Sequence, residues 1–72
     1  SRGTVEALTG PIARGDIGTV EKHLLAFQDK LPEFLPAYRA LGITATDLGL
    51  KKRSLMEEKA SMIKQLLQGG KT

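Results

Sequence analysis

The stretch Leu8-Thr9-Gly10-Pro11-Ile12-Ala13-Arg14-Gly15-Asp16 departs most clearly from the amphipathic pattern of the rest of the chain. Gly10-Pro11 predicts a turn, and Gly15-Asp16 predicts the start of a helix with Asp16 as its N-cap. Arg14 places a cation directly before that start. A glycine-containing loop that leads into a helix N-terminus can hold an anion, so this stretch is the first candidate site.

The composition predicts one small globular domain, with 72 residues of which 40% are hydrophobic and 26% charged. The chain has no cysteine, which excludes disulfides and thiolate metal sites. It shows no signal-peptide pattern and no apolar run of the about 18 residues that a bilayer span needs, so we expect a cytoplasmic protein without membrane contact. The net charge of +3 is mild, and we expect Lys51-Lys52-Arg53 at a helix C-terminus.

Apolar spacing predicts an all-α fold of three helices, over residues 17–29, 33–52 and 55–68, with no strand. Residues 1–8 are too short to bury themselves and predict an N-terminal stub, so we expect a fragment of a longer chain. Leu31 before Pro32 ends the first helix, and Pro36 is an alternative start for the second. Ser54 and Glu57 predict a capping box for the third helix, and Gly69-Gly70 predict its end.

Each helix carries one predicted apolar seam. The seams are Ile17, Val20, Leu24, Phe27 and Leu31; then Phe34, Tyr38, Leu41, Ala45 and Leu48; then Met56, Ala60, Ile63 and Leu67. The second helix also has small residues at helical spacing, namely Gly42, Ala45, Thr46 and Gly49. A helical glycine costs about 1 kcal/mol relative to alanine, so we expect this small-residue face at a buried helix crossing or an intersubunit contact.

Two polar residues have both a structural and a functional interpretation. His23 lies beside the seam of the first helix and is expected to make one hydrogen bond there, or to contact a substrate. Arg14 is expected to pair with Asp16 at the surface, or to hold an anion together with Thr9 and the backbone at Gly15 and Gly18. A lone histidine without cysteines or clustered carboxylates predicts no metal site.

Residues 7–16, followed by Thr19-Val20 and His23-Leu24, resemble the signature of a helical C-terminal domain of unknown function. That domain lies behind an N-terminal Rossmann domain in bacterial proteins similar to pyrroline-5-carboxylate reductase, ketopantoate reductase and 6-phosphogluconate dehydrogenase. The resemblance covers residues 7–68. It implies a helical bundle like the 6-phosphogluconate dehydrogenase C-terminal domain, completed by dimerisation.

The resemblance also implies an NAD(P)-dependent oxidoreductase of unassigned substrate. The helical domain would supply homodimer contacts and one wall of the cleft facing the nicotinamide, without being catalytic alone. No cofactor is expected on this chain, because NAD or NADP belongs to the missing Rossmann domain. The matching motif positions, which are the candidate substrate- or anion-binding residues, are Thr9, Gly10, Pro11, Arg14, Gly15, Asp16 and His23.

Two other hypotheses remain open. The small-residue face and the small core favour a stand-alone helical interaction or dimerisation module. A nucleic-acid binder has support only from the pI of about 9.5 and the basic run at residues 51–53. We do not expect one, because the concentrated basic face typical of such proteins is missing.

Overall fold

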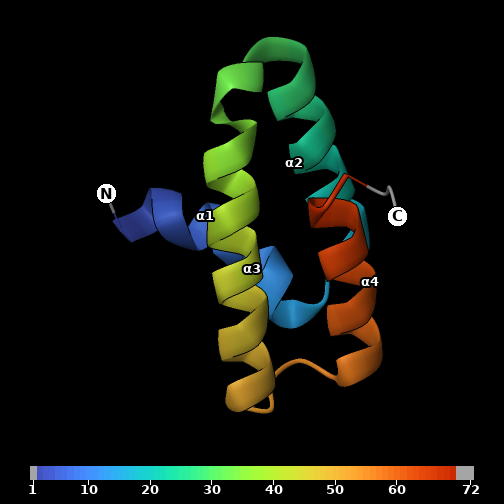
Figure 1. The fold of residues 1–72 in the computed structure, drawn as a ribbon. Coiled ribbons are helices and arrows are strands. Elements are labelled where there is room, and N and C mark those ends of the chain that lie inside the picture. The colour runs from blue at the N-terminus through green and yellow to red at the C-terminus, as the bar shows by residue number, and fades with distance from the viewer. Residues whose placement is uncertain (1, 70–72) are drawn as a thin grey trace.

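The protein is a small all-α bundle, as the apolar spacing predicts. The computed structural model describes residues 2–69 and contains no strand within them. Its elements are α1 (Arg2–Arg14), α2 (Ile17–Lys30), a 3₁₀ turn η1 (Pro32–Phe34), α3 (Leu35–Lys51) and α4 (Glu57–Leu67). Helices α2, α3 and α4 run along a common direction, and α1 crosses behind α3 (Figure 1). No helix in this part of the chain combines the length and the apolar character needed to cross a bilayer.

The first correction concerns the N-terminal quarter of the chain. The predicted stub and loop are wrong: residues 2–14 form one continuous helix that contains Pro11. Proline removes one backbone donor and crowds the preceding turn, which usually ends a helix. Here Pro11 is buried and the adjacent Ile12 is fully buried where α1 crosses α3. Tertiary packing therefore outweighs the local cost of proline.

The turn falls four residues later than predicted, at Gly15. The Gly15 N–H donates to the Ile12 carbonyl at 3.1 Å, and the Asp16 N–H donates to the Pro11 carbonyl at 2.8 Å. This pair of bonds is the Schellman motif, which needs a left-handed residue after the helix. Gly15 supplies it with a φ of 73°. Helix α2 follows at once, with Asp16 as the N-cap that the sequence predicts.

Helix α3 buries its small residues and exposes much of its predicted seam. Its buried residues are Tyr38, Gly42, Thr46 and Gly49. Phe34 and Leu48 are each 50% exposed, so the predicted seam is wrong at these positions. The reason is the closeness of the neighbouring helices. A methyl group added at Gly42 would lie 2.7 Å from Leu67 Cδ1 on α4 and 3.3 Å from Ile12 Cδ1 on α1.

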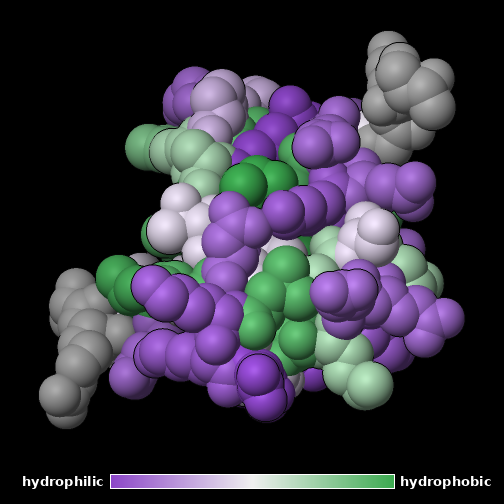
Figure 2. All heavy atoms as spheres, turned by 60° about the horizontal axis from the view of Figure 1, so that its bottom comes forward, coloured by the Kyte–Doolittle hydropathy of each residue, from purple (hydrophilic) through white to green (hydrophobic). Residues whose placement is uncertain are grey.

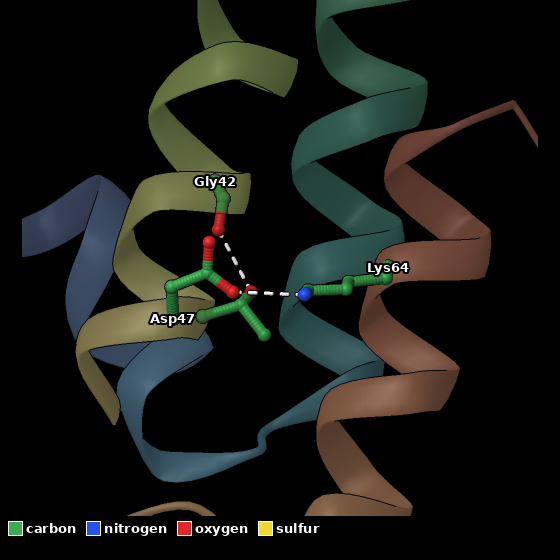
Figure 3. Close-up of polar contacts among 4 residues, drawn as sticks. Gly42, Asp47 and Lys64 are labelled. Atoms are coloured by element: carbon green, nitrogen blue, oxygen red, sulfur yellow. Dashed lines mark hydrogen bonds and ion pairs between the residues drawn. The ribbon is translucent and has the colours of Figure 1, made fainter. Parts of the chain in front are cut away.

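The small-residue face is therefore a crossing within the chain, which is one of the two expected alternatives. Its one buried hydroxyl, on Thr46, donates to the Gly42 carbonyl at 2.7 Å, one turn earlier on the same helix. The next residue, Asp47, forms an ion pair with Lys64 of α4 at 2.8 Å (Figure 3). Both partners are substantially exposed, so this pair contributes at most about 1 kcal/mol. The apolar crossing holds α3 to α4.

Helix α3 ends as the sequence predicts, with its basic residues at the C-terminus. Lys51 is its last residue, and Arg53 adopts a left-handed φ of 62°. The predicted capping box is wrong, because Ser54 belongs to this ending: its N–H donates to the Gly49 carbonyl at 3.0 Å. Met56 is the N-cap of α4 and makes no side-chain cap bond.

The remaining boundaries agree closely with the periodicity. Helix α2 covers the predicted 17–29 and one residue more, and Leu31 breaks the helix before η1. Pro36 lies in the first turn of α3, close to the alternative start. Gly69 closes α4 with a φ of 88°, whereas Gly70 lies outside the described residues. The buried apolar core consists of Ile12, Val20, Tyr38, Leu55, Ala60, Ile63 and Leu67.

Candidate functional site

Thr9 and Gly10 line a groove between α1 and the C-terminal half of α3. The groove has a volume of about 200 Å³, and Lys52 and Ser54 line its opposite side. The Thr9 hydroxyl donates to the Val5 carbonyl at 2.8 Å, so the helix satisfies its donor. The carboxylate of Glu6 lines the same groove. This surface therefore combines hydroxyls, one cation and one anion along an exposed helix crossing.

Arg14 is exposed in the last turn of α1, where its charge favours the negative end of the helix dipole. Its side chain turns back over the preceding turn, and a methyl group at Gly10 would lie 3.0 Å from Arg14 Nη1. The expected surface pair with Asp16 does not form, and Arg14 makes no ion pair with any residue that the structure describes. The guanidinium is thus open to an external anion.

Asp16 is engaged with Thr19 at the start of α2. The Thr19 N–H donates to Asp16 Oδ1 at 3.2 Å, and the Thr19 hydroxyl donates to Oδ2 at 2.8 Å. These hydrogen bonds, the hydroxyl bond first, lower the pKa of the Asp16 carboxyl below its usual value of 3.8, and the charge of Arg14 adds to the effect. The Asp16 carboxylate therefore occupies both Thr19 donors, which leaves neither of them for an external anion.

Pro11 and Gly15 fix the backbone of the corner between α1 and α2. Both are buried, and the Pro11 carbonyl accepts the hydrogen bond that closes the turn. A methyl group at Gly15 would lie 3.1 Å from Leu55 Cδ1, in addition to the strain of a positive φ. These two residues therefore set the position of Arg14 and Asp16 and have no surface of their own to offer a ligand.

His23 lies away from this corner, where α2 contacts α3. Its Nδ1 is 3.3 Å from the Tyr38 hydroxyl, and the two rings meet edge to face at 6.0 Å between centroids. Phe27 stacks on the same tyrosine at 5.0 Å. Burial of Tyr38 raises the pKa of its phenol. The single hydrogen bond of a boundary histidine, expected from the sequence, is the arrangement that the structure has.

The predicted site residues thus fall into two groups. Thr9, Gly10 and Arg14 share one face of α1, while His23 lies among the aromatic rings of α2 and α3. The two described grooves include neither Arg14 nor His23. Within residues 2–69, no cluster of three or more histidine and carboxylate side chains is arranged to hold a metal ion.

Lys52 belongs to the basic run expected at a helix C-terminus, but the sequence does not connect it with the candidate site. It joins Thr9 and Gly10 across the α1–α3 groove and, like Arg14, makes no ion pair with a described residue. No local pattern connects positions 10 and 52, because only the packing of α1 against α3 brings them together. With Arg14 folded against Gly10, two cations border this surface, which can attract an anionic group by charge.

The comparisons with known proteins bear on the same segment. No curated protein matches the chain. No solved structure matches it either. A family model described as a domain of unknown function, DUF2520, matches residues 1–45, which include all the predicted site residues and α1, α2 and the first part of α3. Because this match spans more than half of the sequence, the chain belongs to the DUF2520 family.

Proposed function

We propose that this chain is the helical substrate-cleft and dimerisation domain of a two-domain NAD(P)-dependent oxidoreductase, and that it is not catalytic alone. The proposal rests on the resemblance of residues 7–16 to the domain found behind a Rossmann domain. One structural observation supports it most: Arg14 is exposed and without an ion-pair partner in the described chain, on a corner held rigid by a Schellman turn and an N-cap.

The rigidity of the corner matters because a binding cation is effective when its support is fixed beforehand. Gly15 closes α1, Asp16 caps α2, and the junction packs against Leu55 and Lys59 next to it. Arg14 therefore stands on ordered backbone at the edge of the bundle. Together with Lys52 it would attract the carboxylate of a substrate or a phosphate of the dinucleotide, while the Rossmann domain supplies the second wall.

The experiment uses the protein as its gene encodes it, beside residues 1–72 alone. NADPH and NADH are titrated into each while the nicotinamide fluorescence is followed. The proposal expects saturable binding of one dinucleotide by the gene-encoded protein and none by residues 1–72. The proposal is contradicted if the gene-encoded protein binds neither dinucleotide. It is also contradicted if the sequence upstream of residue 1 lacks a strand, glycine-rich loop and helix.

The alternative is a stand-alone interaction or dimerisation module, and exposed apolar side chains favour it. Phe34, Leu48 and Leu25 are 50%, 50% and 66% exposed, and hydrophobic surface lies between hydrophilic side chains on the face seen in Figure 2. The small-residue face no longer supports this module, since α1 and α4 cover it. The dinucleotide titration separates the two proposals, and sedimentation equilibrium tests dimerisation itself: a monomer at micromolar concentration rules out an obligate dimer of residues 1–72.

A further inference from the structure

A second groove, of about 740 Å³, lies between α2, α3 and α4, away from the α1–α2 corner. Its apolar lining comes from the leucines at positions 24, 25, 35 and 66. Arg39 and Glu21 contribute its charged groups. The volume lies within the range of about 300–1,000 Å³ that small-molecule sites occupy, and an apolar lining with few polar groups is typical of them.

Arg39 carries the observation that points to a ligand. Its Nε is buried, and it has no hydrogen-bond acceptor among the described residues. The guanidinium has thus lost part of its hydration without gaining a partner, which favours binding of an anion to its accessible terminal nitrogens in the groove. Glu21 lines the same groove but forms no ion pair with Arg39. The groove therefore holds a cation whose inner face lacks an acceptor.

We infer that this groove binds a small molecule that has one carboxylate on an apolar body. The carboxylate accepts from the terminal nitrogens of the Arg39 guanidinium, which are not among its buried atoms, because two parallel donors match the two oxygens of a carboxylate. The apolar body lies on the leucines. Glu21 disfavours a second negative charge in the same space, which selects a monocarboxylate over a phosphate dianion.

The probe is octanoate, with octanol and octylamine as ligands of similar length and different charge. Each is titrated into ¹⁵N-labelled protein at pH 7, and amide shifts are followed by NMR. We expect octanoate to shift amides of α2, α3 and α4 around the groove, and octanol and octylamine to bind at least about tenfold more weakly. Equal binding of octanol, or shifts confined to α1, would overturn the assignment.

Two variants test the role of Arg39. Arg39→Met keeps the length and removes the charge, and we expect octanoate affinity to fall by roughly tenfold to a hundredfold. Lys51→Met removes a charge from the exposed end of α3, outside the groove, and should bind octanoate like the wild type. Circular dichroism establishes that each variant folds, and Arg39→Lys, which keeps the charge but lacks the planar fork, should bind with intermediate affinity. If either Arg39 variant folds and still binds octanoate with the affinity of the wild type, the proposal is contradicted.

Discussion

The substitution Gly42→Ala tests the crossing at which α1, α3 and α4 meet. The added methyl group would lie 2.7 and 2.9 Å from the two Leu67 methyl carbons and 3.3 Å from Ile12 Cδ1, below the 3.4–4 Å of ordinary contact. Leu67 and Ile12 are both fully buried, so neither can move into solvent. Overpacking of this kind costs about 1–3 kcal/mol, and the better helix propensity of alanine returns about 1 kcal/mol. We expect a net destabilisation of up to about 2 kcal/mol.

Gly18→Ala is the matched control, because a methyl group there would meet only Asp16 Oδ1, at 4.0 Å. It gains helix propensity without overlap and should stabilise the protein by up to about 1 kcal/mol. Urea unfolding followed by circular dichroism at 222 nm measures both. With an m-value of about 1 kcal/mol/M, the midpoint of Gly42→Ala should fall by up to about 2 M while m stays constant. A Gly42→Ala variant as stable as Gly18→Ala would refute the close crossing and free this face for another chain.

Three further predictions concern the α1–α2 corner and the left-handed turn that follows α3. Arg53→Gly should stabilise the protein by about 0.5–1 kcal/mol in urea unfolding, since Arg53 has a φ of 62°, whereas Lys52→Gly at a φ of −83° should destabilise it; equal effects would contradict the role of the left-handed turn. Asp16→Ala should lower the thermal midpoint at pH 7 but much less at pH 2. Because the pKa of Asp16 is lowered in the folded state, its carboxylate stabilises the protein above the unfolded pKa near 3.8, and this stabilisation is lost as the pH falls through the folded pKa. A difference in thermal midpoint that does not depend on pH would refute this. Gly10→Ala and Arg14→Ala should leave the unfolding midpoint of residues 1–72 unchanged or higher, yet both should weaken substrate binding in the gene-encoded protein, since a methyl group at Gly10 displaces the Arg14 guanidinium; unchanged kinetics in both would refute the site assignment.

The sequence predicts α2 well because its signals are local and agree with one another. Asp16 stands where an N-cap should, Val20 and Phe27 keep the helical period, and Pro32 follows its end. Each of these features acts within one turn of helix. Nothing elsewhere in the fold overrides them.

Helix α1 could not be predicted from the same kind of signal. Gly10-Pro11 is a turn signal on its own, and what overrides it is the burial of Pro11 and Ile12 against a helix more than 20 positions later in the sequence. The end of α1 does have a local signal in the sequence. A basic residue followed by glycine, Arg14-Gly15, is typical of a helix C-terminus as well as of the approach to a new helix.

The sequence predicts two faces for α3, of which the small-residue face is buried and the large apolar seam is wrong at Phe34 and Leu48. Leu41 and Leu48 follow the helical period as well as Gly42 and Gly49 do, so the period does not decide which of the two sets is buried. The choice is made by the approach of Leu67 and Ile12, which come from the two ends of the chain. For the candidate site, the sequence identified Arg14 and Asp16, whereas the contribution of Lys52 depends on the same long-range packing.

We propose that the α1–α2 corner forms one wall of a dinucleotide-dependent cleft. Hydrogen–deuterium exchange of the gene-encoded protein, with and without saturating NADPH or NADH, tests it without knowledge of the substrate. We expect slower amide exchange in residues 9–19 when the dinucleotide is bound, and a smaller slowing of exchange in the Arg14→Ala variant. Unaltered exchange in this segment, with a dinucleotide demonstrably bound elsewhere in the protein, would contradict it.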